Sequence, residues 1–375
     1  MSGLSLLLII LLIPVSGLLF INLNSELGGN PTKEQTIKYI QSDNYKDGKF
    51  FNQIPTSLDM NFKKFISVLG DFLKGDPTRQ PDFELPVEKI DSLEITNKTT
   101  DYTRLTWFGH SAFLLEMDGK NILIDPMLGE SPSPIPVLGS KRYSRELPIT
   151  INKMPAIDIV VISHDHYDHL DYGSIKKLID KVGSFYTPLG VGVHLEKWGI
   201  SKEKIHELDW WDEIKHENLT FILTPSRHFS GRGLFDRNTT LWGSWVIKGI
   251  DDNIYFSGDG GYGPHFKEIG EKYGPFDFAM IECGQYDERW NQIHMMPEES
   301  ARAAVDVKAK LMMPIHWGAF TLALHSWTDP VERVIAKARE LDMPVATPKI
   351  GEVILLDTLN KSYSMWWEKS VMVNK

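Results

Sequence analysis

The stretch VVISHDHYDHLDYG, residues 160–173, places three histidines and three aspartates within eight positions, directly after an apolar run. The apolar run predicts a buried strand, and the polar residues then occupy the loop at its carboxyl end. On an extended chain, the side chains of His164 and His166 project to the same side and can bind one divalent ion. Asp168 and His169 enter the following helix on a different face, so they can bind a second ion.

Three further His and Asp residues follow other apolar stretches, and these are His228, Asp259 and His316. In layered α/β proteins, ligands bind at the carboxyl ends of the strands, so we expect these side chains to meet the first group. His228 would complete the first metal site, His316 the second, and Asp259 would bridge them. Two ions about 3.5–4 Å apart can activate water and hold substrate oxygens, so Asp168 and Asp259 are predicted to serve catalysis as well.

From Arg104 onward, short apolar strands alternate with helical stretches. Asp118-Gly119 is a typical two-residue hairpin turn between two of these strands. Strands buried on both faces that alternate with helices indicate a layered α/β fold. Helices are predicted at residues 173–182, 264–273, 297–308 and 329–341.

The composition indicates a globular protein, with 42% hydrophobic and 24% charged residues in 375. The net charge of −10 argues against nucleic acid as the main partner, because phosphate binding requires a basic surface. The single cysteine, Cys283, excludes an intrachain disulfide and leaves metal binding to His and carboxylate side chains.

Residues 1–23 are predicted to form a separate hydrophobic segment. Residues 4–21, LSLLLIILLIPVSGLLFI, are eighteen without a charge, and about 17 suffice to span a bilayer. No Lys or Arg precedes this run, and the small-residue cleavage candidate near Ser16 lies inside it. An uncleaved membrane anchor is therefore favoured over a signal peptide or a core helix, and we expect the protein to be membrane-associated through this segment.

Residues 24–103 are predicted to contain a polar linker up to about residue 54, an amphipathic helix and an extended segment at 77–98. The helix has two interpretations: it docks on the domain core, or it rests on lipid with Lys63 and Lys64 toward the headgroups. The domain that carries the predicted metal ligands spans 104–358, and a C-terminal tail is predicted at 359–375. The apolar residues at helical spacing are Phe62, Phe65, Ile66, Leu69, Phe72 and Leu73.

The sequence resembles the metallo-β-lactamase fold superfamily through SHDHYDHLD and the three later His and Asp residues. Within it, the chain is similar to N-acylphosphatidylethanolamine-hydrolysing phospholipase D and its bacterial relatives. TWFGHSAFLLEMDG, GSKRYSR, TPSRHFSGRGLFDRNTTLWGSWVI, YDERW and IHWGAF occur in the family's order. The resemblance implies an αββα four-layer sandwich, preceded here by the N-terminal hydrophobic helix, and two Zn²⁺ ions. It assigns His164, His166 and His228 to one zinc, Asp168, His169 and His316 to the other, and Asp259 to both.

Several residues around the cluster are candidates with two interpretations each. His294, in NQIHMMPEES, falls where the phospholipase family has a histidine near the scissile phosphate. This implies that it steadies developing charge or protonates the leaving alkoxide, the alternative being a helix N-terminal histidine without a role. Asp171 either orients a ligand histidine or caps the next helix. The candidate substrate contacts are Lys141, Arg142 and Arg145, which a solvated loop would also explain, and Tyr286.

The leading hypothesis is a membrane-associated dinuclear-zinc phosphodiesterase of the phospholipase D type. It would cleave N-acylphosphatidylethanolamine to N-acylethanolamine and phosphatidic acid, with the phospholipid and the membrane as partners, no nucleic acid, and a homodimer as an allowed assembly. The alternative keeps the metals and changes the substrate, giving a lactonase or another small-ester or phosphodiester hydrolase. A non-catalytic binding module is the third hypothesis, which the intact ligand set disfavours.

Overall fold

The computed structural model describes residues 24–57, 62–96, 102–137, 139–356 and 362–368. The predicted N-terminal hydrophobic helix lies outside these residues. Within the described ranges, no helix combines the length and the apolar character needed to cross a bilayer.

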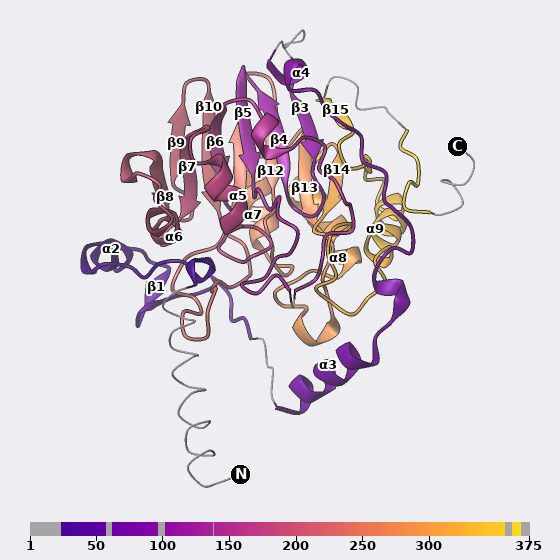
Figure 1. Cartoon of the computed structure of the whole chain (residues 1–375), viewed down its shortest axis with the longest axis horizontal. Coiled ribbons are helices and arrows are strands. Elements are labelled where there is room, and N and C mark those ends of the chain that lie inside the picture. Colours follow the sequence, from indigo (N-terminus) through magenta and orange to yellow (C-terminus); the bar gives the residue numbers. More distant parts are fainter. Residues whose placement is uncertain (1–23, 58–61, 97–101, 138, 357–361, 369–375) are drawn as a thin grey trace.

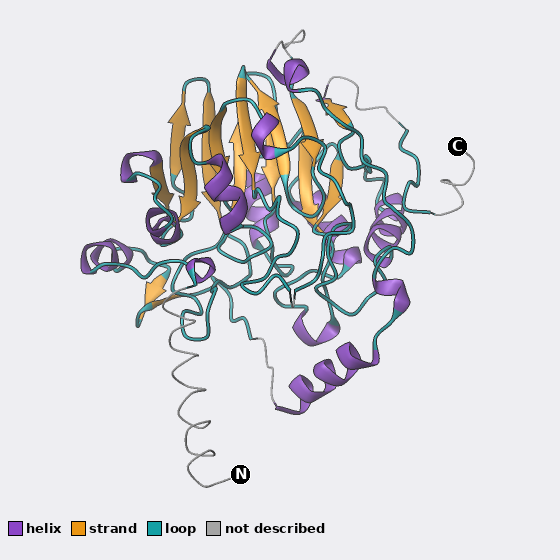
Figure 2. Ribbon diagram, viewed as in Figure 1, coloured by secondary structure: helices purple, strands orange, loops and turns teal. Residues whose placement is uncertain are grey.

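Two β-sheets form the centre of the molecule (Figures 1 and 2). The larger has the order β15-β3-β4-β5-β6-β7-β8, with β15 Val353–Leu355, β3 Arg104–Trp107, β4 Phe113–Met117, β5 Lys120–Ile124, β6 Ile157–Val161, β7 Val182–Pro188 and β8 Ile205–Leu208. The smaller has the order β14-β13-β12-β11-β10-β9, with β14 Met312–Ile315, β13 Phe278–Glu282, β12 Asn253–Phe256, β11 Ser244–Lys248, β10 Leu219–Thr224 and β9 Glu213–His216. Strands β5 to β8 pair in parallel, as do β12 to β14, so their carboxyl ends share an edge.

The predicted hairpin turn is confirmed between β4 and β5. Met117 pairs with Lys120, which leaves Asp118 and Gly119 as the two turn residues. Their φ angles are 48° and 79°, and a two-residue turn with both φ values positive matches the twist of the flanking strands.

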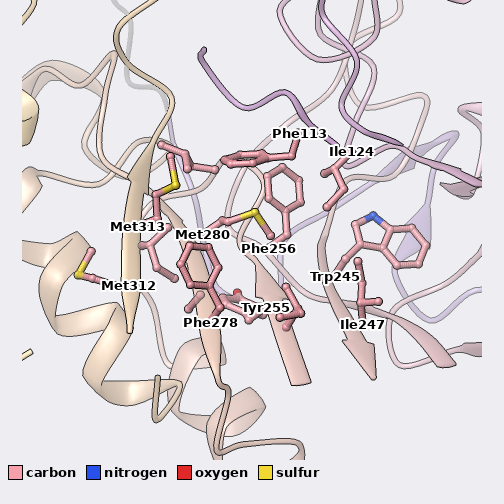
Figure 3. Close-up of a cluster of buried hydrophobic side chains, with 14 of the residues drawn as sticks. Phe113, Ile124, Trp245, Ile247, Tyr255, Phe256, Phe278, Met280, Met312 and Met313 are labelled. Carbon is pink, nitrogen blue, oxygen red and sulfur yellow. The ribbon is translucent and has the colours of Figure 1, made fainter. Parts of the chain in front are cut away.

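The apolar core lies between the sheets, and Figure 3 shows the side chains of both sheets meeting there. Phe113 of β4 and Ile124 of β5 belong to the same buried cluster as Phe256 of β12 and Phe278 of β13. Removing apolar area from water is favourable by about 25 cal/mol per Å², so burying each such side chain stabilises the fold by roughly 1.5–3 kcal/mol. Burial on both inner faces therefore fixes the two sheets against each other.

Helices cover the outer faces of both sheets, as the layered α/β prediction requires. A second buried cluster joins Leu114 and Val160 of the larger sheet to Leu178 of α5 and Leu195 of α6. Helix α8 packs on β13 and β14, and α9 packs on α8. The bounds are α5 Tyr172–Leu178, α6 Gly192–Lys197, α7 His265–Lys272, α8 Pro297–Asp306 and α9 Asp329–Glu340. Helix α5 ends four residues before its predicted end, because the chain turns into β7 at Val182.

The N-terminal region differs from its prediction as a linker and an extended segment. Tyr39 and Phe50 are buried, so residues 24–54 pack against the fold. A polar helix with a single buried residue has no apolar periodicity to reveal it, which is why the sequence suggests a linker. The elements are η1 Ser25–Leu27, α2 Lys33–Tyr39, β1 Tyr45–Lys46, β2 Lys49–Phe50, η2 Pro77–Arg79 and α4 Ser92–Thr96, the last two inside the segment predicted to be extended.

The predicted amphipathic helix is present as α3, Phe62–Lys74, but it does not dock on the core through its apolar side. None of its residues is buried, and the six apolar residues are between 41% and 79% exposed. Its polar side faces the domain instead, where Arg289 Nη1 lies 2.9 Å from Asp71 Oδ2 and 3.2 Å from Ser67 Oγ.

Candidate metal centre

The HDHYDH loop begins where β6 ends, and a neighbouring strand holds it in place. Asp125, directly after β5, accepts the Ser163 backbone N–H at 2.7 Å and the Ser163 hydroxyl at 2.5 Å. Its Oδ2 also lies 2.6 Å from His169 Nδ1. One buried carboxylate therefore fixes both ends of the loop.

Three histidines of the first predicted site converge on one point. His164 Nε2 lies 2.9 Å from His166 Nδ1, and His228 Nε2 lies 3.2 Å from the same atom. Burial lowers the pKa of all three imidazoles, and the charges of neighbouring imidazoles lower those of His164 and His228 further. Neutral rings whose nitrogens face one another at this distance offer lone pairs to a cation.

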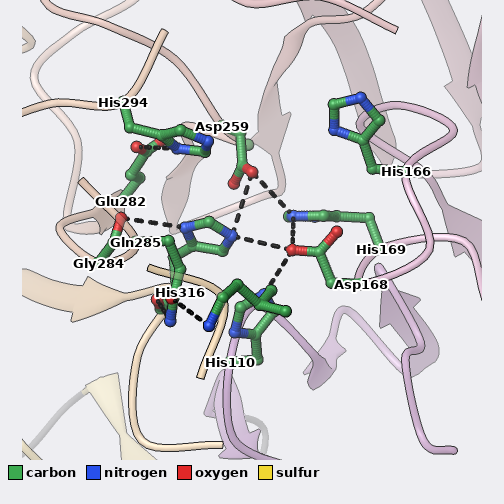
Figure 4. Close-up of polar contacts among 12 residues, drawn as sticks. His110, His166, Asp168, His169, Asp259, Glu282, Gly284, Gln285, His294 and His316 are labelled. Atoms are coloured by element: carbon green, nitrogen blue, oxygen red, sulfur yellow. Dashed lines mark hydrogen bonds and ion pairs between the residues drawn. The ribbon is translucent and has the colours of Figure 1, made fainter. Parts of the chain in front are cut away.

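The second predicted site lies beside the first (Figure 4). His316 Nε2 lies 3.1 Å from Asp168 Oδ2, and His169 Nε2 lies 3.6 Å from it. Burial alone would raise the pKa of Asp168, but His169 and the hydrogen bonds of His110 and His316 hold it well below its usual value. His110 is an addition to the predicted set, with its Nε2 2.9 Å from Asp168 Oδ2.

Asp259 lies between the two groups, as predicted for a bridging ligand. Its Oδ2 is 3.1 Å from the Nε2 atoms of both His169 and His316. The same oxygen is 3.9 Å from His164 Nε2 and 4.0 Å from His228 Nε2. The seven predicted ligands thus meet in one cluster although they come from four strand ends.

The residues present fit divalent metal ions. The outward ring nitrogens already have partners, since His228 Nδ1 lies 2.8 Å from Ile293 O and His164 Nδ1 lies 2.9 Å from Ser163 Oγ. Such outer hydrogen bonds are typical of metal-bound histidines. Among the described residues, buried Asp259 Oδ1 has no hydrogen-bond partner, so one lone pair is left for a cation. Despite burial, Asp259, Asp168 and Asp125 raise the pKa of His169 well above its usual value, so this point attracts positive charge.

A cavity of about 290 Å³ opens over the cluster. Four of its lining residues belong to the predicted ligands, and Phe229, Trp290, Ile293 and Leu322 give it an apolar wall. His294 also lines it, and its ring centroid is 5.3 Å from that of His316. His294 therefore stands where a substrate on the cluster would meet it.

The predicted substrate contacts are not brought to this cavity. The Arg142 guanidinium donates to the backbone oxygens of Phe108, Gly129 and Met127, so each of its three nitrogens already has a partner within the fold. Lys141 is exposed. Of the remaining two candidates, Arg145 is exposed 3.8 Å from Glu84, and the Tyr286 hydroxyl donates to Asp329.

The structure resolves the alternative for Asp171 and adds residues that the sequence analysis missed. Asp171 accepts the backbone N–H of Ser174 at 2.8 Å and caps α5. The missed residues are His110, Asp125 and Glu282. Asp125 and Glu282 stand at the carboxyl ends of β5 and β13, so the rule that identified Asp259 could have found them. His110 lies in a turn between two strands and carries no comparable signal.

The comparisons with known proteins agree with this geometry. Residues 120–317 match the family model of the β-lactamase superfamily domain. The chain belongs to the metallo-β-lactamase superfamily. Igni18, a metallo hydrolase from the archaeon Ignicoccus hospitalis, has the same fold, with a TM-score of 0.53 and 24% identity over 68% of this chain and 97% of its own.

Two curated proteins are similar to this chain over most of their length. An uncharacterised protein of Mycobacterium tuberculosis is 40% identical over 317 residues, which are 83% of this chain and 84% of that protein. N-acyl-phosphatidylethanolamine-hydrolyzing phospholipase D 1 of Caenorhabditis elegans is 32% identical over 289 residues, 72% of this chain and 80% of that protein. This chain is accordingly a metal-dependent hydrolase, and its His/Asp cluster can bind the metal.

Proposed function

We propose that this hydrolase is a phospholipase D that uses two zinc ions to cleave N-acylphosphatidylethanolamine to N-acylethanolamine and phosphatidic acid. The observation that carries the proposal is the cavity, where the ligand cluster, an apolar wall and His294 meet. Similarity to the C. elegans phospholipase D over 80% of that protein supports the same substrate class.

The metal-binding residues would be the seven of the cluster, three around each ion with Asp259 between them. Bound there, zinc ions supply Lewis-acid charge and lower the pKa of a water molecule. The protein's own contribution begins with holding these side chains. Asp125, the Ile293 carbonyl and the Ser163 hydroxyl fix the ring orientations of His169, His228 and His164 respectively.

His294 would act on the phosphodiester itself. Its Nδ1 lies 2.8 Å from Glu282 Oε1, which leaves Nε2 as the ring atom for a substrate in the cavity. From this position the ring can donate a hydrogen bond to a phosphoryl oxygen or pass a proton to the departing alkoxide of the N-acylethanolamine. Phe229, Trp290, Ile293 and Leu322 would keep bulk water away from the reacting phosphate and contact acyl chains.

A membrane is the proposed source of the substrate. Residues 4–21 have the length of a bilayer anchor, and α3 exposes six large apolar side chains. A phospholipid that leaves a bilayer meets less water on its way to the cavity if the protein rests on the membrane. Membrane association would therefore serve catalysis by shortening the transfer of the acyl chains.

The proposal is tested with zinc-loaded protein and vesicles that contain N-acylphosphatidylethanolamine, with mass spectrometry of the products. We expect N-acylethanolamine and phosphatidic acid in equal amounts. Phosphatidylethanolamine without the N-acyl chain is the matched substrate control, and an aliphatic lactone tests the alternative hydrolase. A protein that opens the lactone and leaves both lipids intact would overturn the phospholipase assignment.

A further inference from the structure

Residues Asn24–Gly29, here called the N-terminal strap, are bound to α6 and to the residue after it largely through their backbone. The Trp198 indole N–H donates to Ser25 O at 2.8 Å, and Lys197 Nζ donates to Gly28 O at 2.6 Å. The strap includes η1 and is part of the indigo segment near the label β1 in Figure 1. These two contacts fix the strap against the carboxyl end of α6.

The strap reaches the metal ligands by a first route through His194 of α6. The backbone N–H of Gly29 donates to His194 Nδ1 at 3.0 Å, so the ring proton is on Nε2. His194 Nε2 then donates to Asp165 Oδ2 at 3.2 Å. Asp165 is the buried residue between His164 and His166, so its carboxylate sets the direction in which this part of the loop runs.

A second route runs through Arg232, whose side chain is buried. Its Nε donates to Glu26 O of the strap at 2.8 Å. Its Nη1 donates to Asp165 O at 2.5 Å and Leu170 O at 2.8 Å. These two carbonyls flank the segment that carries three of the metal ligands, and the guanidinium stacks 4.1 Å from the centroid of Tyr167 inside that segment. One cation thus clamps both ends of the ligand loop to the strap.

Glycine is needed where the strap meets His194. Gly28 has a φ of +73°, and a Cβ there would lie 2.0 Å from His194 Nδ1. At Gly29, a Cβ would lie 2.4 Å from Val193 O. A side chain at either position would push the strap off α6, because neither contact leaves room for a carbon atom.

We propose that the N-terminal strap is a positioning element of the metal centre, which through His194 and Arg232 holds the HDHYDH loop in its metal-binding geometry. Outer hydrogen bonds that orient metal ligands typically change metal affinity by about 10- to 100-fold. The inference rests on the metal-binding part of the proposed function and is independent of the lipid substrate. The strap follows directly on the apolar segment of residues 4–21, so the strap connects the proposed membrane anchor to the HDHYDH loop.

The test compares two glycine-to-valine substitutions in the full chain. Gly28→Val displaces the strap, whereas Gly70→Val, in α3, places the same side chain where nothing lies within 4 Å. The zinc dissociation constant is measured by competition with a chromophoric chelator, and ligand geometry by the visible spectrum of the cobalt-substituted protein. We expect Gly28→Val to weaken zinc binding about 10-fold or more and to alter the cobalt spectrum, and Gly70→Val to change neither.

Thermal unfolding separates positioning from stabilisation. A strap that only stabilises the fold would lower the Tm of the metal-free and zinc-loaded forms equally, with the dissociation constant unchanged, and that result would overturn the inference. If Gly28→Val does not fold, His194→Ala interrupts the first route while the other strap contacts stay, and unchanged zinc affinity would again count against it. Zinc binding of the wild type without lipid cleavage would refute only the substrate assignment.

Discussion

His294 Nδ1 lies 2.8 Å from Oε1 of Glu282, a buried carboxyl group at the end of β13 (Figure 4). The backbone N–H groups of Gly260 and Met295 donate to the same carboxyl group, so Glu282 cannot rotate away. Burial and the neighbouring Asp259 raise the pKa of Glu282 well above its usual value. The pair therefore holds one ring, in a fixed orientation, at the edge of the cavity over the metal ligands.

Loss of the His294 ring or of its contact with Glu282 should lower kcat more than it changes KM. We expect His294→Asn to reduce kcat by about 100-fold, the lower range for loss of a general acid or base. Glu282→Gln should reduce kcat by about 10-fold with zinc content unchanged, because it loosens the ring and leaves the seven ligands in place. In the double variant the losses should not add, since both act through one proton-bearing ring. Additive losses in a full double-mutant cycle would show that His294 and Glu282 act independently, which would contradict this prediction.

Asp259→Asn should remove metal and activity together. Oδ2 of Asp259 lies 3.1 Å from the Nε2 atoms of two ligand histidines. An amide at this position carries no negative charge, so it cannot offset the repulsion between two cations. Elemental analysis of the purified variant should find less zinc per chain than in the wild type, with turnover near background.

The matched control for that prediction is Asp171→Asn, the same change of side chain near the same loop. Asp171 caps α5 and binds no metal in the proposed arrangement, and asparagine is about as good a helix cap as aspartate. Its zinc content should equal that of the wild type, and its free energy of unfolding should fall by less than the roughly 1 kcal/mol that loss of a helix cap costs. Full zinc and turnover in Asp259→Asn would refute the bridging role.

The free energy of unfolding should decrease as the pH is lowered, partly because of a histidine outside the metal centre. Burial, assisted by the charge of Arg227, lowers the pKa of His265 to about 3 from the 6.5 of an unperturbed histidine. Between these pH values His265 binds a proton in the unfolded chain but not in the folded chain. Its contribution to stability is therefore fully present above pH 6.5 and is lost progressively as the pH falls toward 3. One such group contributes at most about 1.4 kcal/mol per pH unit.

His265→Gln tests this dependence because glutamine does not titrate. Denaturant unfolding at several pH values between 6.5 and 4 should give the variant a shallower decline in the free energy of unfolding than the wild type. The variant's stability at pH 7 is its own reference, so a general loss of packing does not affect the comparison. Equal slopes in the two proteins would show that folding does not lower the pKa of His265.

The parts of the site that the sequence predicts are those set by local chain geometry. A strand end fixes where the next side chain lies, so His164, His228, Asp259 and His316 could be placed at one edge without knowledge of the strand order. The turn at Asp118-Gly119 and the cap at Asp171 follow from the conformational preferences of single residues.

The parts that escaped prediction depend on contacts between distant segments. Asp125 contacts the HDHYDH loop because β5 and β6 are neighbours in the sheet. The order of strands in a sheet cannot be read from the sequence of either strand. Arg142 is of a residue type that commonly binds phosphate, but in the folded chain each nitrogen of its guanidinium donates to a backbone carbonyl. For α3, periodicity predicts a helix and an apolar side, yet which side meets the domain is decided by Asp71 and Arg289, which are 218 residues apart.

The exposed apolar side of α3 yields the last prediction, on the source of the substrate. Phe62 and Leu73 are each 79% exposed, so their replacement by serine should leave the free energy of unfolding within about 0.5 kcal/mol of the wild type. If this side rests on lipid, the double variant should cleave vesicle-borne substrate more slowly and detergent-dispersed substrate at the wild-type rate. Ile250→Ser is the control, since Ile250 is 66% exposed in the turn before β12, at the sheet edge opposite the metal centre. Equal losses on vesicles and in detergent would mean that α3 acts on the cavity, through Arg289 and Trp290, instead of on the membrane.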